Sequence, residues 1–153
     1  MTTNPAGQSP SLDDRGMPAG ATLREGLEIT PRQAKSRFET PGRLVLVDVR
    51  TKPEWDLVHI PGSVHIPLDE IERRHDEIDR APDQELAILC HHGVRSMKAA
   101  LALRALGHAG AVSVAGGIEL WSLAADPSIP RYERGPGVLR LVDDASRPGS
   151  PGA

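Results

Sequence analysis

The chain of 153 residues has one cysteine, Cys90, and only four side chains of the Phe, Trp and Tyr types. A single cysteine cannot form an intramolecular disulfide. The scarcity of aromatic residues requires a mainly aliphatic core, which suits buried parallel strands and the helices that cover them. No hydrophobic run approaches the roughly 18 residues of a membrane span, and the N-terminus has no apolar segment for export. We therefore expect a soluble protein of a reducing cytoplasm that does not bind membranes.

The chain also lacks a concentration of positive charge. Its formal net charge is −3, and its lysine and arginine residues are scattered along the sequence. This distribution argues against direct binding to nucleic acid. His59 and His65 flank a Pro-Gly turn, but no second cysteine and no carboxylate stands at ligand spacing from them. The sequence therefore predicts neither a metal site nor a cofactor.

Both ends of the chain differ in composition from the middle. Residues 1–26 are rich in proline, glycine and small polar residues and lack apolar periodicity, so they are predicted to be disordered. Residues 133–153 have the same character and are predicted to be largely disordered, with a short apolar patch at 138–142. This patch either packs back on the domain or adds to a sheet edge or a partner, and the sequence leaves that choice open. The ordered domain is expected to span residues 27–132.

Between the ends, strand-like apolar runs alternate with helical spacings, which indicates an α/β fold with a mainly parallel sheet. Thr30 and Pro31 provide the cap and the first residue of a helix. Residues 44–49 form a nearly continuous apolar run, as expected for a strand that is covered on both faces. A further helix is predicted over 97–106, with Ser96 as its N-terminal cap.

Cys90 stands where an apolar run, residues 86–89, gives way to a short loop and then to the predicted helix. A free cysteine at the end of a buried strand is often only a small apolar core residue. Here, however, Gly93 allows the N–H groups of the loop to converge on one point, and Arg95 adds a fixed positive charge. A helix N-terminus and a nearby guanidinium favour the thiolate form. These residues predict a nucleophilic cysteine in a loop that stabilises negative charge.

The loop is one of four motifs that point to the same family. It reads Cys90-His91-His92-Gly93-Val94-Arg95-Ser96, and the others are Leu44 to Arg50, then Glu54-Trp55 with His59 to Ser63 and His65 to Pro67, and finally Gly116 to Trp121. In this order they resemble the C-x-x-G-x-R active-site loop, the second strand, the E-aromatic…HIPGA…IP segment and the G-G-x-x-x-W ending of rhodanese-like sulfurtransferases. Each motif alone would be weak evidence, but four in order are strong.

The resemblance implies a three-layer fold in which helices flank a five-stranded, mainly parallel sheet with the strand order 1-5-4-2-3. It also implies a sulfurtransferase in which Cys90 takes a sulfane sulfur from thiosulfate or a persulfide and carries it as a persulfide. A thiol, a partner protein's cysteine or cyanide would then collect the sulfur. The loop residues that would surround the transferred sulfur are His91, His92, Gly93, Val94, Arg95 and Ser96.

Three charged residues near the strand ends, Asp48, Arg50 and Glu54, are predicted to form an ion-pair network that ties a loop to the next helix and supports the site. The pair His91-His92 departs from relatives that carry arginine or lysine after the cysteine. We therefore expect weak attraction for a small dianion such as thiosulfate and a steeper dependence on pH near neutrality.

Three other functions fit parts of this pattern. Cdc25-type phosphatases share the fold, but their loop is one residue longer and carries arginine six positions after the cysteine, whereas Arg95 is at the fifth position. Non-catalytic binding or regulatory modules of the family typically lack the cysteine. A thiol redox sensor would need a resolving thiol from another molecule, because this chain has no second cysteine. Persulfide formation on Cys90 is the observation that separates these alternatives.

Overall fold

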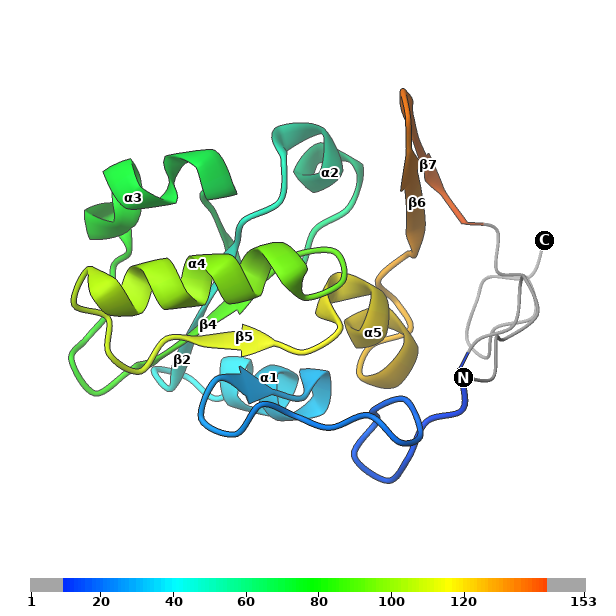
Figure 1. The fold of residues 1–153 in the computed structure, drawn as a ribbon, viewed down its shortest axis with the longest axis horizontal. Helices are drawn as coiled ribbons and strands as arrows, with labels where there is room; N and C mark the ends of the chain where they lie inside the picture. Colours follow the sequence, from blue (N-terminus) through cyan, green and yellow to red (C-terminus); the bar gives the residue numbers. More distant parts are fainter. Residues whose placement is uncertain (1–9, 143–153) are drawn as a thin grey trace.

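A computed structural model describes residues 10–142 and shows a central sheet of five parallel strands in the order β1-β5-β4-β2-β3 (Figure 1). The strands are β1 (Glu28–Ile29), β2 (Leu44–Asp48), β3 (Val64–His65), β4 (Glu85–Leu89) and β5 (Val112–Val114). The predicted α/β fold and the expected strand order are confirmed. Because the five strands are parallel, their carboxyl ends meet at one edge, where open α/β sheets bind their ligands.

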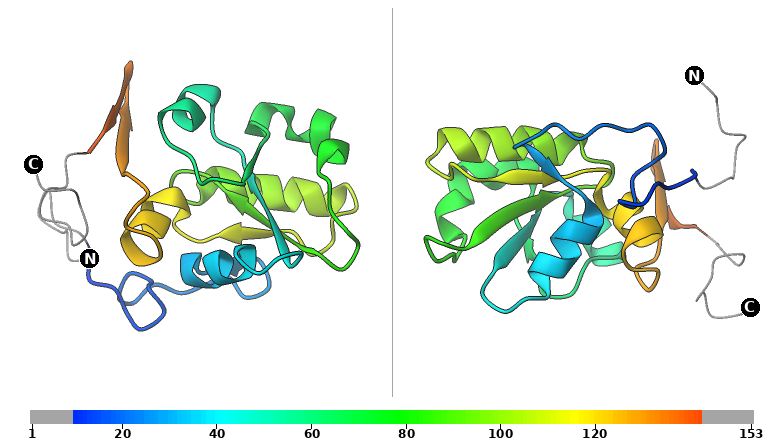
Figure 2. Two further views of the ribbon diagram at one scale, coloured as in Figure 1. Left: turned by 180° about the vertical axis from the view of Figure 1, so that it is seen from behind. Right: turned by 90° about the horizontal axis from the view of Figure 1, so that it is seen from below.

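Helices cover both faces of the sheet and complete three layers (Figure 2). One core cluster includes Ala34 and Trp121 and lies against α1 and α5, and the other includes Ile71 and Leu103 and lies against α3 and α4. No helix within residues 10–142 is long and apolar enough to cross a membrane. The helices are α1 (Pro31–Phe38), α2 (Lys52–Leu57), α3 (Ile71–Arg74), α4 (Val94–Ala105) and α5 (Gly117–Ala124), with short 3₁₀ turns η1 (Leu68–Glu70) and η2 (His75–Glu77) on either side of α3.

Local sequence signals begin the first helix where they predict it. Thr30 caps α1: its hydroxyl accepts from the backbone N–H of Gln33, and the Gln33 side chain accepts from the backbone N–H of Thr30. Pro31 occupies the first position of the helix, where its missing N–H leaves no hydrogen bond unmade. The central strands β2 and β4 pair along their whole lengths, from Leu44 with Glu85 to Asp48 with Leu89. This register brings the ends of both strands to the same level.

Residues 10–26, which the sequence predicts to be disordered, pack on the domain instead. Met17 is only 4% exposed and forms a third apolar cluster with Ala115 and Leu120. The segment has too few apolar residues to show periodicity, but several of them pack against Ala115 and the helix α5. Proline and glycine content alone therefore gives the wrong answer here. Residues 1–9 lie outside the part of the chain that the structure describes.

The expectation of disorder after residue 132 is also wrong as far as residue 142. Strands β6 (Tyr132–Gly135) and β7 (Val138–Leu141) form an antiparallel hairpin that stands apart from the main sheet (Figure 1). The apolar patch at 138–142 therefore pairs with β6 rather than with an edge of the five-stranded sheet, and its Leu139 packs against the first core cluster. The remaining residues, 143–153, lie outside the described part.

Candidate active site around Cys90

Cys90 directly follows β4 and is 1% exposed. Its Sγ accepts a hydrogen bond from the backbone N–H of Gly93 at 3.0 Å, and the thiol donates to Ser96 Oγ at 3.2 Å. A second hydroxyl, that of Ser113 on β5, is 2.7 Å from Ser96 Oγ. The sulfur therefore sits at the base of the loop, among hydrogen-bonding groups that can stabilise a charged form.

The loop ends in the N-terminus of α4. Gly93 is the residue before the helix, and its φ of 102° lies in the left-handed region, which glycine adopts without steric cost. The first N–H groups of α4 have no acceptor within the helix, and the positive end of its dipole lies beside the sulfur. Ser96 is not the cap that the sequence predicts. It lies within the first turn of α4, fully buried, and its hydroxyl bonds Cys90 and Ser113 instead.

The pair Gly116-Gly117 lets the start of α5 touch the backbone of this loop. The N–H groups of Ile118 and Glu119 donate to the carbonyls of Cys90 and His91, at 2.8 and 3.2 Å respectively. A Cβ atom on Gly117 would lie 2.4 Å from the carbonyl oxygen of His91, too close for any side chain. The Gly-Gly motif therefore allows a close backbone contact that holds the loop in place.

Arg95 makes a bidentate ion pair with Glu54 on α2, with N–O distances of 2.7 and 2.9 Å. This hydrogen bonding raises the pKa of Arg95. The sequence predicts a fixed positive charge near the cysteine, and the guanidinium of Arg95 also ties the loop to a carboxylate of the neighbouring helix. The positive charge beside Cys90 is therefore largely compensated.

A sequence model of the rhodanese-like domain matches residues 30–124. The chain belongs to the rhodanese-like domain family. That match contains the loop, the glycine pair and Glu54. It ends before the β6–β7 hairpin.

Several known proteins are similar to this chain over most of its length. The Mycobacterium tuberculosis protein named "Probable adenylyltransferase/sulfurtransferase MoeZ" is 34% identical over 112 residues, which make up 73% of this chain but 29% of that protein. A rhodanese-like domain protein from Staphylococcus aureus is 30% identical, with a TM-score of 0.58 over 70% of this chain and 99% of that one. The human single-domain sulfurtransferase TSTD1 is 28% identical, with a TM-score of 0.54 over 61% of this chain and 93% of that one. The chain thus spans less than a third of the mycobacterial relative.

The rhodanese-like site has a buried second layer that links Asp48, Arg50 and Glu54. Arg50 and Asp48 are completely buried and form a bidentate ion pair whose shortest N–O distance is 2.7 Å. The sequence predicts one ion-pair network of all three residues, but Glu54 makes no direct ion pair with Asp48 or Arg50 in the described part of the chain. The hydroxyl of Tyr132 connects them, because it accepts from Arg50 at 3.1 Å and donates to Glu54. Tyr132 begins β6 and was not identified from the sequence, since a lone tyrosine near an apparently disordered tail carries no signal.

Glu54 is the centre of this hydrogen-bond network. Burial raises the pKa of Glu54, but hydrogen bonds from Arg95 and Tyr132 outweigh that effect and hold the pKa far below its ordinary value. Arg134, on the hairpin strand β6, is a second guanidinium at 3.1 Å from the same carboxylate. The sequence did not predict Arg134 as a site residue either, although Arg134 bonds Glu54, which was predicted.

The two loop histidines have different environments. His91 is 5% exposed, and its ring stacks on Tyr132 with a centroid distance of 4.0 Å. Burial, assisted by the neighbouring His92, lowers the pKa of His91 to about 4. His91 therefore stays neutral between pH 6 and 8, and the expectation that it contributes to pH dependence near neutrality is wrong. His92 is exposed at the mouth of the site.

The other motif histidines pack against Trp55. The rings of His59 and His65 both stack on the Trp55 ring, with centroid distances of 3.9 and 4.8 Å. Their nitrogens bond the backbone carbonyls of Trp55 and Arg50. Within residues 10–142, no cluster of three or more histidine, cysteine or acidic residues is placed to hold a metal ion.

Proposed function

We propose that this protein is a cytoplasmic sulfurtransferase that carries a sulfane sulfur as a persulfide on Cys90. The observation that carries the proposal is the position of Sγ, 3.0 Å from the Gly93 N–H and beside the N-terminus of α4. Relatives named as sulfurtransferases support it, among them the human single-domain protein. The chemistry requires only the thiolate and the loop, so no cofactor takes part.

In the first step the Cys90 thiolate attacks the outer sulfur of the donor. With thiosulfate, a new S–S bond forms to Cys90 while the S–S bond of thiosulfate breaks, and sulfite leaves with that bond's electron pair. With a persulfide donor, the leaving group is the donor's thiolate. The step is nucleophilic catalysis with a covalent intermediate.

The loop residues His91 to Ser96 are assigned to the terminal sulfur of this intermediate. The N–H groups at the start of α4 have no acceptor within the helix, so those of Val94, Arg95 and Ser96 can stabilise the negative charge as in an oxyanion hole. The Ser96 hydroxyl, which accepts a hydrogen bond from the Cys90 thiol, can donate one to the sulfur once the thiol has ionised. Asp48, Arg50 and Glu54 support the loop from behind without touching the sulfur.

In the second step a nucleophilic acceptor attacks the outer sulfur of the persulfide. The S–S bond to Cys90 breaks, and Cys90 leaves as a thiolate, ready for another cycle. The acceptor is a small thiol, the cysteine of a partner protein or, in the test tube, cyanide. The same loop then stabilises the departing Cys90 thiolate.

Intact-mass measurement tests the proposal. We expect a mass gain of one sulfur on the protein after incubation with thiosulfate or with a persulfide donor, and loss of that gain on addition of cyanide. Cys90→Ser should abolish both the gain and thiocyanate formation, because a hydroxyl does not ionise near neutral pH, while circular dichroism remains unchanged. A wild-type protein that gains no sulfur from either donor would support a binding module. One that instead forms a mixed disulfide under oxidation would support a redox sensor.

A further inference from the structure

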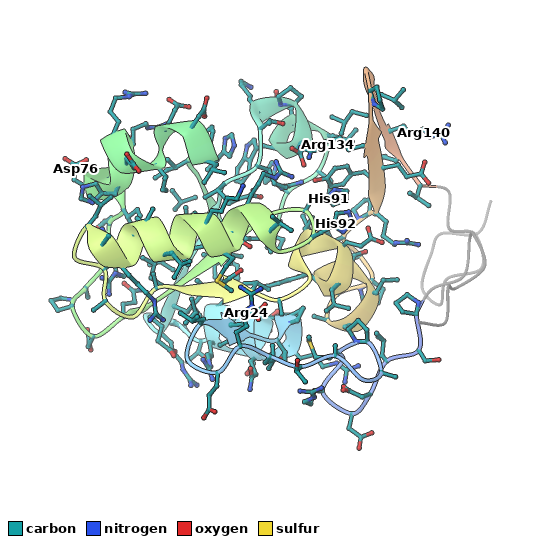
Figure 3. All side chains as sticks on the ribbon, viewed as in Figure 1. Arg24, Asp76, His91, His92, Arg134 and Arg140 are labelled. Atoms are coloured by element: carbon teal, nitrogen blue, oxygen red, sulfur yellow. The ribbon has the colours of Figure 1, made fainter. Side chains whose placement is uncertain are left out.

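A pocket of about 610 Å³ opens between the Cys90 loop and the β6–β7 hairpin. It lies at the edge of the candidate active site, because His91 and His92 form part of its wall. The hairpin supplies most of the rest, and Figure 3 shows Arg134 and Arg140 on the hairpin above the two histidines. The residues that line the pocket are His91, His92, Glu119, Arg131, Tyr132, Glu133, Arg134, Gly135, Val138, Arg140 and Val142.

Among the residues that the structure describes, the charged groups of this wall leave one positive charge in excess. Arg131 is paired with Glu119, and Arg140 with Glu133. Arg134 is different, because its partner Glu54 already forms the bidentate pair with Arg95. One buried carboxylate thus serves two guanidiniums. The side chain of Arg134 is 48% exposed, so the uncompensated charge faces the pocket and solvent.

The hairpin holds Arg134 in a fixed position. Tyr132, two residues earlier on β6, is 2% exposed and bonded to both Arg50 and Glu54. Across the hairpin, Arg134 is paired in register with Leu139, which packs on the core. A cation held in this way loses less side-chain freedom when it binds a ligand.

The size and lining of the pocket indicate the ligand class. Its volume lies within the range of about 300–1,000 Å³ that is typical of small-molecule sites, which is much more than a single compact anion needs. Val138, Val142 and Gly135 provide apolar contacts for a carbon chain. His91 Nε2 is buried without a hydrogen-bond partner among the described residues and lies 3.9 Å from a carboxylate oxygen of Glu119.

We propose that this pocket binds the body of a low-molecular-weight thiol that carries a carboxylate, and that Arg134 recognises the carboxylate. The proposal rests on the sulfur-transfer function, for which it names the acceptor class. The thiolate of the ligand attacks the outer sulfur of the Cys90 persulfide, the S–S bond to Cys90 breaks, and the ligand leaves as its persulfide. Arg134 thus supplies the positive charge that relatives place in the loop, where this chain has His91 and His92 instead of arginine or lysine.

The test compares acceptors that differ in the charge of their tail. Protein loaded with persulfide is mixed with 3-mercaptopropionate, 2-mercaptoethanol or cysteamine, and loss of the Cys90 persulfide is followed by intact mass. We expect Arg134→Gln to lower the rate ratio of the anionic to the neutral thiol by about 3- to 10-fold, as for loss of a partly exposed charge-assisted hydrogen bond. The effect should shrink at high salt, and Arg134→Lys should retain part of it. Intrinsic thiol reactivity cancels between variants.

Arg43→Gln is the matched control. Arg43 is 51% exposed, is also paired with one glutamate and precedes β2, so it lies at the opposite edge of the sheet from Cys90. This variant should leave the ratio unchanged. If Arg134→Gln also leaves the ratio unchanged while the persulfide forms and transfers normally, the acceptor site is refuted and the sulfurtransferase function stands.

A second measurement does not depend on sulfur transfer. Alkylation of Cys90, the only thiol in the chain, is timed with anionic iodoacetate and with neutral iodoacetamide. We expect Arg134→Gln, but not Arg43→Gln, to lower the iodoacetate-to-iodoacetamide rate ratio by a similar factor. A protein that forms no persulfide but shows this drop would refute the proposed function and retain the anion site. An unchanged alkylation ratio would refute the anion site itself.

Discussion

The substitution Glu54→Gln removes one negative charge from the centre of the buried network while keeping the size of the side chain. In the wild type this carboxylate accepts from Arg95 at 2.7 and 2.9 Å, from Arg134 at 3.1 Å and from the Tyr132 hydroxyl. A glutamine places an NH₂ group opposite one of these donors and leaves two guanidiniums without a counter-charge. We expect a large loss of stability.

The size of that loss follows from burial. Removing one partner of a buried ion pair costs about 3–5 kcal/mol. Here Glu54 is 1% exposed, but the side chains of Arg95 and Arg134 are 18% and 48% exposed, so water recovers part of their solvation. We therefore expect Glu54→Gln to lower the free energy of unfolding at pH 7 by about 2–4 kcal/mol, measured by urea denaturation.

The pH dependence gives the sharper test. The pKa of Glu54 is held far below its ordinary value of 4.5, so its stabilising contribution is complete above pH 4.5 and is lost as the pH falls below that value toward the folded-state pKa. The difference in unfolding free energy between wild type and Glu54→Gln should therefore narrow below pH 4.5, by about 1.4 kcal/mol for each pH unit. All other carboxylates titrate in both proteins and cancel.

Glu77→Gln is the control for this series. Glu77 is likewise bonded to an arginine, Arg74, by two hydrogen bonds, but its side chain is 54% exposed. Solvent screens such a pair, so Glu77→Gln should lower the free energy of unfolding far less than Glu54→Gln does. If the two variants lose equal stability, or if the Glu54→Gln difference stays constant from pH 7 to pH 3, Glu54 is not the charged centre of the site.

Two further substitutions test the loop. Gly117→Ala should destabilise the protein by about 2–4 kcal/mol, because strain at its φ of 62° adds to a clash with the His91 carbonyl. The control Gly137→Ala, at a similar φ of 66° with open space around it, should cost only about 1–2 kcal/mol; equal thermal shifts would contradict the proposed contact. The pKa of His91, lowered to about 4, means that the unfolded chain takes up a proton below about pH 6.5 while the folded protein does not. The stability that neutral His91 confers is thus lost as the pH falls from 6.5 to 4. When the pH is lowered from 7 to 5, we expect the free energy of unfolding, measured by urea denaturation, to fall by about 1–2 kcal/mol less in His91→Gln than in the wild type. Parallel losses in the two proteins would mean that His91 titrates normally.

The sequence by itself determined the elements that depend on local order. Thr30 and Pro31 start α1 because capping and a fixed proline φ act over three or four residues. The apolar run before Cys90 forms a buried strand, and Gly93 adopts the positive φ that the loop requires. The strand order came from the family resemblance rather than from periodicity, which records which residues face a core but not which strands are neighbours.

Only the tertiary structure decided which charged groups meet. Arg95 and Glu54 are 41 residues apart, and Arg134 and Glu54 are 80 apart. No local rule links such positions, because their contact depends on how α2, α4 and the hairpin pack around the sheet edge. The terminal segments show the same limit. Met17 and Leu139 have no apolar periodicity around them, yet each is held by a surface that the rest of the fold supplies. Packing against the rest of the domain, rather than local propensity, fixes these residues.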